Sequence, residues 1–289
     1  MRKRLIYRVD DVGYTPAYDM GVNLVFDAGT GCSADVMFDA PHVIEELKIL
    51  KEKPWLSIGW HRHLWESPVL GDKVPSMVDE EGRFKWRHRH NEFRKDVTYE
   101  DALREFEAEM RLCYKYLGRY PDIASLMDSD LPMEKAYNEV VKKYIPAYNI
   151  FSTDDKTPRV RKADPKWADK NIISVHIQPD KDKGFDLKYF DEYDPLSKMI
   201  NLKWTEKEEI YFYGWHPGFC DAHIMAESRC NLHRCKEHEA AVSEEFKKWI
   251  IENHVELINF RDALYGTDEF QQHLKEINSP LWIGNMTEE

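Results

Sequence analysis

Short apolar runs alternate with longer segments of helical periodicity along most of the chain. The longer segments repeat apolar residues at spacings of three and four, which is typical of amphipathic helices. A chain in which candidate strands and helices alternate in this way is expected to form a parallel α/β fold. The candidate strands lie at residues 5–9, 34–38, 55–61, 122–128, 147–151, 171–177, 209–216 and 255–260.

Capping residues mark the ends of several predicted helices. Thr15 suits an N-cap, Pro16 suits the first helical position, and Gly29 suits a helix stop. Thr98 and Asp101 have the spacing of a capping-box variant at the start of a long amphipathic segment. The predicted helices cover residues 15–29, 41–53, 98–118, 132–144, 234–253 and 268–277.

These elements predict an irregular (β/α) barrel of about seven parallel strands, similar to a TIM barrel, with a doubly wound open sheet as the alternative. No repeat, low-complexity segment or linker divides the chain, so we expect a single domain over residues 1–289. The connection at residues 66–97 is long for a barrel. We expect it to be a lid near the active site or a disordered insert.

Composition narrows the class of protein. The formal net charge of -12 argues against a nucleic acid or an anionic membrane as partner, because both require a basic surface. No run has the length of a membrane span, and Arg8 interrupts the first apolar stretch before it reaches signal-peptide length. Five scattered cysteines favour reduced thiols and a cytoplasmic location. A homodimer is a guess that no sequence signal supports.

Polar residues stand at the carboxyl ends of the predicted strands. In parallel α/β folds this edge of the sheet carries the chemistry, because strand ends from distant parts of the chain meet there. A single Asp at such a place is usually a turn former or cap, and a single His is usually structural. Several together indicate a metal site, since carboxylate and imidazole bind zinc and other divalent ions. The residues concerned are Asp10, Asp11, His61, Asp128, Asp130 and His216.

Two adjacent carboxylates, Asp10 and Asp11, end the first strand. Neighbouring side chains of a strand point to opposite faces, so these two residues are expected to have different roles. One could bind a metal while the other reaches its water, and the cation would offset their mutual repulsion.

Further residues could bind substrate. Trp60, Trp65 and Trp215 flank the strand-end residues and could stack on a sugar ring, although core packing explains each equally well. Arg87 and Arg89 in the long connection could accept an anionic group such as a sugar phosphate, or they could belong to a solvated charge cluster.

The stretch "CNLHRCKEH" (230–238) brings two cysteines and two histidines close together. Its spacing is poor for a zinc finger, and it opens an amphipathic helix. A helix with buried thiols is therefore the expected reading.

The motifs in this order resemble the YdjC-like family of carbohydrate deacetylases, relatives of chitooligosaccharide deacetylase. The resemblance rests on "DDVG" (10–13), "SADVMFDAP" (33–41), "IGWHRHLW" (58–65), "VPSMVDEEGRF" (74–84), "WHPGFCD" (215–221), and the pair Arg234 and Glu237. It implies an irregular barrel of parallel strands and a hydrolase that removes N-acetyl groups from amino sugars with one divalent metal.

Residue by residue, the resemblance implies Asp11 and His61 as metal ligands, Asp10 as general base and His216 as general acid. The third ligand of the family is a His in a segment like "DSHxH", where this chain has "MDSDLP" with Asp130 at that position. Two carboxylates and one imidazole shift the expected ion from zinc toward magnesium or manganese.

This departure leaves three functions open. The first is a metal-dependent deacetylase acting on a small carbohydrate. The second is a carbohydrate-binding or regulatory relative that has lost turnover through the Asp130 change. The third is a barrel hydrolase or isomerase for another small substrate, such as an acylated amine or a sugar phosphate.

Overall fold

A computed structural model describes residues 2–87, 91–151, 160–161, 172–175, 179, 182–204 and 210–286. The chain divides into two compact units, which we describe separately. Unit 1 comprises Met1–Asp35, Trp55–Ser57 and Lys170–Glu289, and unit 2 comprises Val36–Pro54 and Ile58–Asp169. The single domain over residues 1–289 stays a prediction.

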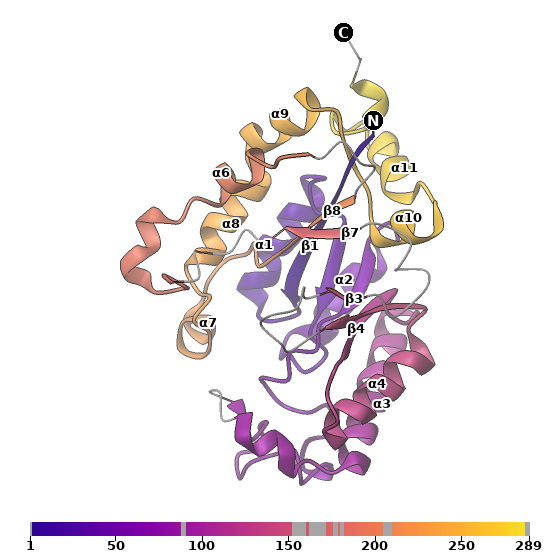
Figure 1. Ribbon diagram of the computed structural model, residues 1–289, viewed down its shortest axis with the longest axis vertical. Helices are drawn as coiled ribbons and strands as arrows, with labels where there is room; N and C mark the ends of the chain where they lie inside the picture. Colours follow the sequence, from indigo (N-terminus) through magenta and orange to yellow (C-terminus); the bar gives the residue numbers. More distant parts are fainter. Residues whose placement is uncertain are drawn as a thin grey trace. The chain divides into compact units, whose positions relative to one another are not determined.

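A parallel sheet forms the centre of unit 1 (Figure 1). Its longest strand, β1 (Lys3–Val12), pairs in parallel with β8 (Ile210–Trp215) and, at its start, with β9 (Val255–Leu257). Strand β7 (Ile172–Val175) extends the sheet beyond β8, also in parallel. On the other side β1 is next to β2 (Ser33–Val36), where the Cys32 amide donates to the Tyr7 carbonyl.

Helices follow the strands of unit 1, and the predicted N-cap of the first helix is present. The Thr15 hydroxyl accepts a hydrogen bond from the Tyr18 amide at the first helix, as predicted. The predicted helix at 234–253 is wrong in one respect, because Ser243 is extended and caps a second helix. The helices are α1 (Pro16–Asp27), α6 (Pro195–Ile200), α7 (Ala222–Glu227), α8 (His233–Val242), α9 (Glu244–Glu252), α10 (Phe260–Tyr265) and α11 (Glu269–Glu276), with the 3₁₀ helices η4 (Leu187–Glu192) and η5 (Ile283–Asn285).

Unit 2 has a second set of parallel strands covered by long helices (Figure 1). Strand β4 (Ile123–Met127) pairs in parallel with β3 (Ser57–Trp60) and β5 (Ala147–Phe151), whereas β6 (Val160–Arg161) is antiparallel to β5. Helices α3 and α4 pack against each other. The helices are α2 (Val43–Lys51), α3 (Tyr99–Leu117) and α4 (Pro132–Tyr144), with the 3₁₀ helices η1 (Gly71–Lys73) and η3 (Asn91–Asp96).

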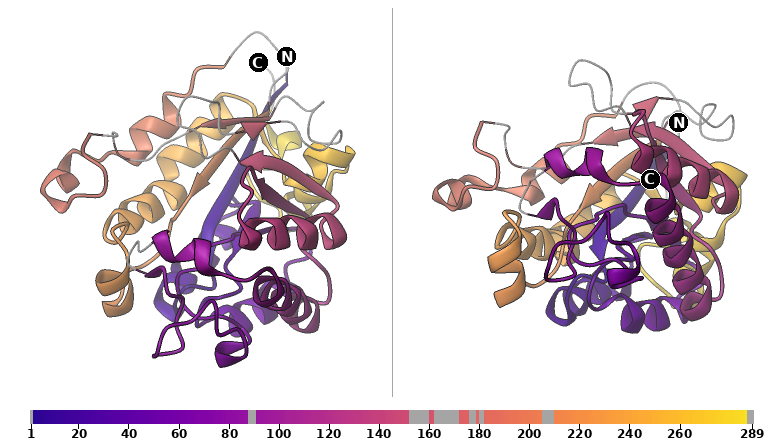
Figure 2. Two further views of the ribbon diagram at one scale, coloured as in Figure 1. Left: turned by 60° about the horizontal axis from the view of Figure 1, so that its bottom comes forward. Right: turned by 90° about the horizontal axis from the view of Figure 1, so that it is seen from below.

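The long connection at 66–97 is coloured purple in Figure 2, and its described residues adopt an ordered structure. Val74, Met77, Phe84 and Trp86 are buried. The Trp86 indole donates to the carbonyl of Leu64. The described residues of this connection are therefore ordered around buried apolar side chains, and its role as a lid stays a prediction.

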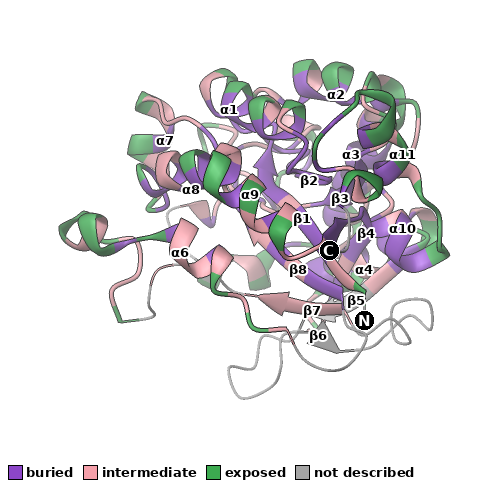
Figure 3. Ribbon diagram, turned by 90° about the horizontal axis from the view of Figure 1, so that it is seen from above, coloured by how far each residue is buried: buried purple, intermediate pink, exposed green. Residues whose placement is uncertain are grey.

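Apolar side chains fill the centre of each unit, as the burial colouring in Figure 3 shows for the strands. The helices turn exposed faces outward, as α2 does with Ile49. Parallel strands connected by helices confirm the predicted α/β class with a TIM-barrel-like arrangement, β6 being the antiparallel exception. Within the described residues, none of the helices is both long and apolar enough to cross a bilayer.

Candidate active site

The register between β1 and β8 brings the first and last of the predicted site residues together in unit 1. Val9 is paired with Trp215 in the parallel ladder, so both strands reach the same edge of the sheet. Asp10 and Asp11 follow Val9, and His216 follows Trp215. The prediction that these strand ends share one edge is therefore confirmed for unit 1.

Asp10 is held by an arginine on the same face of its strand. Arg8 Nε donates to Asp10 Oδ1 at 2.6 Å, and Arg8 Nη2 donates to Oδ2 at 3.1 Å. The same guanidinium lies 3.3 Å from a carboxylate oxygen of Asp35. Asp10 and Asp35 offer oxygens within 4.8 Å of each other. The positive charge of Arg8 offsets the repulsion between these two buried carboxylates.

Asp11 turns away from the strand because its backbone is left-handed, with φ of 59°. Few residue types other than glycine adopt this conformation, and Asp and Asn are among them. Asp11 Oδ2 accepts a hydrogen bond from Arg234 Nη2 at 2.6 Å and lies 4.0 Å from His216 Nε2. The adjacent aspartates therefore have different partners, as the sequence predicts, but the left-handed backbone at Asp11 departs from the regular strand alternation on which that prediction rested.

Arg234 is the buried cation of this region, with 1% of its surface exposed. Its Nε donates to the Cys230 carbonyl at 2.6 Å, and its guanidinium carbon lies 4.8 Å above the Tyr18 ring. The Gly218 amide donates to the Arg234 carbonyl at 3.3 Å. A Cβ at Gly218 would lie 2.3 Å from the Tyr18 ring, so the "WHPG" turn requires glycine there.

Glu237 fixes the segment that carries His216. Its Oε2 accepts the backbone amide of His216 at 2.8 Å, and its Oε1 accepts the Tyr193 hydroxyl at 2.8 Å. Burial raises the pKa of Glu237 to about 7, although both hydrogen bonds and Arg234 act to lower it.

A divalent metal is implied by the family resemblance, and the residue types in unit 1 fit one. Asp10 and Asp11 offer carboxylate oxygen, and His216 offers imidazole nitrogen. The bond from Arg234 to Asp11 does not prevent binding, because a carboxylate has a second oxygen that can reach a cation. Asp11 is the residue of unit 1 that would hold the metal.

The other two predicted ligands belong to unit 2. His61 follows β3, and its backbone amide donates to the Val36 carbonyl at 2.9 Å. The Asp130 side chain is fully exposed and forms an ion pair with Lys135 at 3.1 Å. Within the described part of unit 2, Asp130 belongs to no group of three close His, Cys, Asp or Glu donors. The ligand roles of His61 and Asp130 stay predictions.

The three predicted tryptophans differ in their surroundings. Trp60 is 2% exposed, donates to Glu109 at 2.7 Å, and packs against the Tyr137 ring. Trp215 is equally buried. Core packing, which the sequence also allowed, therefore accounts for both. Trp65 is partly exposed, and it remains a candidate for stacking on a sugar.

The predicted anion-binding arginines are only partly described. Arg87 forms an ion pair with Glu81 at 3.4 Å, and its side chain is 15% exposed. Arg89 lies outside the described residues. A phosphate-binding role for both stays a prediction.

The "CNLHRCKEH" stretch does not gather its own donors into a group of three among the described residues. His233 packs against the Phe190 ring, and His238 packs against the Phe219 ring. Cys230 is buried, and Cys235 is partly buried. The expected helix is present as α8, which carries both histidines and the partly buried Cys235. The buried thiol of Cys230 lies before the start of that helix.

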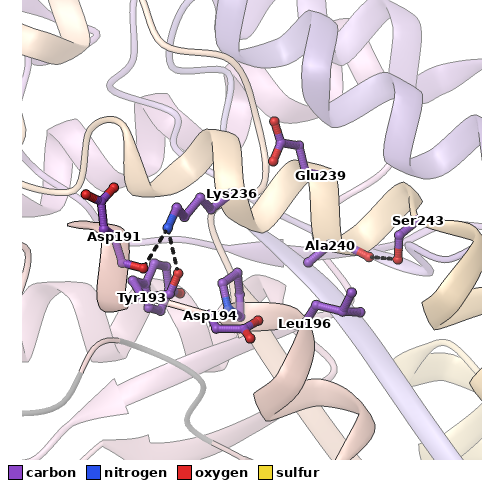
Figure 4. A pocket seen from close by; sticks show the side chains of 9 residues that line it. Asp191, Tyr193, Asp194, Leu196, Lys236, Glu239, Ala240 and Ser243 are labelled. Carbon is purple, nitrogen blue, oxygen red and sulfur yellow. Dashed lines mark hydrogen bonds between the residues drawn. The ribbon is translucent and has the colours of Figure 1, made fainter. Parts of the chain in front are cut away.

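A cavity of about 480 Å³ lies in unit 1 between the segment at 191–196 and α8 (Figure 4). Tyr193, Lys236 and Glu239 line it, and Lys236 donates to the Tyr193 carbonyl at 3.0 Å. Asp10, Asp11 and His216 do not line this cavity. It therefore gives no support to the site predicted from the sequence.

Sequence reasoning missed several contacts of the site. Arg8 could have been found, because it precedes Asp10 by two residues in a strand and so shares its face. The sequence indicates Arg234 and Glu237 only through the family resemblance. Their contacts with Asp11 and His216 depend on the docking of α8 against the sheet, which no local pattern encodes.

Comparison with known proteins identifies the family. The model of the family described as "YdjC-like protein" matches residues 4–252, so the chain belongs to the YdjC-like family. A carbohydrate deacetylase from Enterococcus faecalis is 24% identical, over 89% of this chain and 97% of its own length. Carbohydrate deacetylase 2 from Listeria innocua is 26% identical, over 90% of this chain and 98% of its own length.

A solved structure has a similar fold. It is an Enterococcus faecalis protein for which cellobiose-phosphate cleavage has been suggested, and it is 24% identical with a TM-score of 0.64. The similarity covers 91% of this chain and 99% of that protein. It supports the fold independently of the strand pattern.

Proposed function

We propose that this chain is a metal-dependent hydrolase that removes N-acetyl groups from amino sugars or chitooligosaccharides. Membership of the YdjC-like family and the names of its relatives support this class of reaction. The observation that carries the proposal is the approach of Asp11 to His216 at 4.0 Å beside Asp10, at the shared ends of β1 and β8.

The roles are those that the family resemblance implies, and the chemistry of each side chain is compatible with them. A divalent metal, when bound, lowers the pKa of a water and polarises the acetamide carbonyl. The family resemblance implies that Asp11 would hold that metal, and it gives His61 and the position of Asp130 the same role. Asp10 accepts the proton of the attacking water, and Arg8 holds this carboxylate with two hydrogen bonds.

His216 completes the reaction as proton donor. The C–N bond of the amide breaks, and the leaving amine nitrogen takes a proton from the protonated His216 ring, the imidazolium. The products are acetate and the free amino sugar. Glu237, through the backbone amide of His216, keeps this imidazole next to Asp11.

Acetate release tests the proposal. The full chain, supplied with Mg²⁺, Mn²⁺ or Zn²⁺, is expected to release acetate from acetylated chitooligosaccharides. Asp10→Asn and His216→Ala are each expected to lower the rate by about 10²- to 10⁴-fold. Asp27→Asn, an exposed aspartate in the last turn of α1, is the control and should retain the rate.

Metal content separates the ligands from the proton-transfer residues. His61→Ala should lower the metal retained after dialysis, whereas Asp10→Asn should not. Phosphorylated and neutral acetylated sugars are assayed together, because Arg87 and Arg89 are predicted to bind an anionic group. Unchanged acetate release in Asp10→Asn with full metal content would refute the assigned base.

A carbohydrate-binding relative without turnover is the second candidate. It is favoured by one observation, the fully exposed Asp130 paired with Lys135 at the position where the family resemblance expects a ligand. Binding of an acetylated sugar by calorimetry, without acetate release at any metal concentration, would favour this alternative.

A further inference from the structure

Three donors of different chemistry meet beside the proposed active site. His216, Cys230 and Glu237 each offer one ligand atom, and these atoms lie within 4.8 Å of one another. All three belong to unit 1. Glu237 is 1% exposed and Cys230 is 8% exposed, so this is not a cluster of solvated surface charges. Neither the metal ligands nor the proton-transfer roles described above include Cys230.

We propose that His216, Cys230 and Glu237 form a binding site for a thiophilic divalent cation such as Zn²⁺ or Cd²⁺, and that a cation bound there inhibits the enzyme. The inhibition rests on the proposed function, because it removes His216 as proton donor. The binding site itself does not depend on that function.

The spacing of the donors suits zinc. Bond lengths of about 2.0–2.3 Å place the ligands of a tetrahedral zinc about 3.4 to 3.6 Å apart. His216 Nδ1 and Glu237 Oε2 are 3.8 Å apart, which requires only a small adjustment. The set of one nitrogen, one sulfur and one oxygen matches the ligand types of zinc, and the fourth position is left to solvent.

Neighbouring groups already orient these donors. The Tyr193 hydroxyl donates to Glu237 Oε1 at 2.8 Å, so Oε2 is the oxygen directed toward His216. The Cys230 carbonyl accepts hydrogen bonds from Arg234 Nε at 2.6 Å and from the Ser228 hydroxyl at 3.1 Å. Contacts of this kind around metal ligands typically change metal affinity by about 10- to 100-fold.

An ion can reach the site from solvent, and its binding releases the proton of the Cys230 thiol. The His216 side chain is 14% exposed, which provides a route from solvent. As the bond to Cys230 sulfur forms, the thiol proton passes to solvent, because only the thiolate is a ligand. With the cation on His216 Nδ1, the ring can no longer hold a proton on both nitrogens, so the imidazolium that donates a proton to the leaving amine does not form.

Cadmium titration of the full chain tests the site directly. We expect a thiolate-to-cadmium charge-transfer band in the ultraviolet that saturates with one bound ion. Cys230→Ser should abolish the band, whereas Cys235→Ser should retain it. Tyr193→Phe should weaken cadmium binding by about 10- to 100-fold. Circular dichroism confirms that each variant is folded, and Cys230→Ala serves as a second variant if Cys230→Ser is not.

Zinc inhibition tests the consequence. Each variant is compared with its own rate before extra Zn²⁺ is added, so the ratio reports inhibition alone. The ratio should approach one in Cys230→Ser and stay at the wild-type value in Cys235→Ser. A cadmium band that survives in Cys230→Ser, or no band at all, would overturn the proposal. A Cys230-dependent band without any acetate release would support the site and count against the deacetylase function.

Discussion

Removing the buried guanidinium of Arg234 is expected to destabilise unit 1. In Arg234→Met the side chain keeps much of its volume but loses its charge, so the Asp11 carboxylate, 4% exposed, loses its cationic partner. Breaking a buried ion pair by removing one member costs about 3 to 5 kcal/mol. The lost donor to the Cys230 carbonyl and the lost contact with Tyr18 act in the same direction.

The assay is urea unfolding at pH 7 with EDTA present, followed by circular dichroism. Arg234→Lys is the matched control, because it keeps the charge and loses the Nε donor, and about 1 to 2 kcal/mol is expected for it. The double variant Asp11→Asn/Arg234→Met should recover part of the loss, since a neutral amide needs no cation. A loss below about 1 kcal/mol for Arg234→Met would refute the reasoning, because that is the range of solvated pairs.

A divalent cation should change this result. If Asp11 binds the metal, the cation supplies the positive charge that Arg234→Met lacks, and saturating Mn²⁺ or Zn²⁺ should reduce the destabilisation. By reciprocity, the variant should bind the metal more tightly than the wild type. Equal destabilisation with and without metal would argue against Asp11 as a ligand.

Two further predictions concern the scaffold. Burial raises the pKa of Glu105 from 4.5 to about 7. As the pH rises, the unfolded chain therefore loses this proton before the folded protein does. The free energy of unfolding should fall between about pH 4.5 and pH 7, by at most about 3 kcal/mol. Urea midpoints at pH 5 and pH 8 should differ less in Glu105→Gln than in the wild type, and an unchanged difference would show that another group is responsible. Ser243→Ala removes the hydroxyl that accepts the Phe246 amide at 3.1 Å, and thermal unfolding should show a loss of about 1 kcal/mol. No loss would mean that α9 does not depend on this cap.

Periodicity predicted the fold well because it is a local signal. The apolar runs and the caps at Thr15 and Thr98 encode strands and helix starts within a few residues. The break at Ser243 was missed, because the amphipathic pattern continues across it and one backbone turn changes the helix direction.

The site was less predictable because its contacts are long-range. The ends of β1 and β8 could be placed together from parallel pairing alone. The sequence could not decide whether Trp60 lies in the core or at the site surface, since both locations favour an aromatic residue after an apolar run. The acceptor of the Trp60 indole is Glu109, a buried carboxylate on a helix 49 residues away, and no local pattern announces it.

The left-handed backbone at Asp11 limits which residues this position can accept. A side chain in that conformation costs of order 1 to 3 kcal/mol for most residue types, and the cost is lowest for Asn, Asp and Gly. Replacing Asp11 with Cys or Glu would therefore meet a backbone penalty in addition to any effect on the proposed metal. Asn is the substitution that removes the charge and keeps the turn intact, so Asp11→Asn separates the role of the carboxylate from that of the backbone.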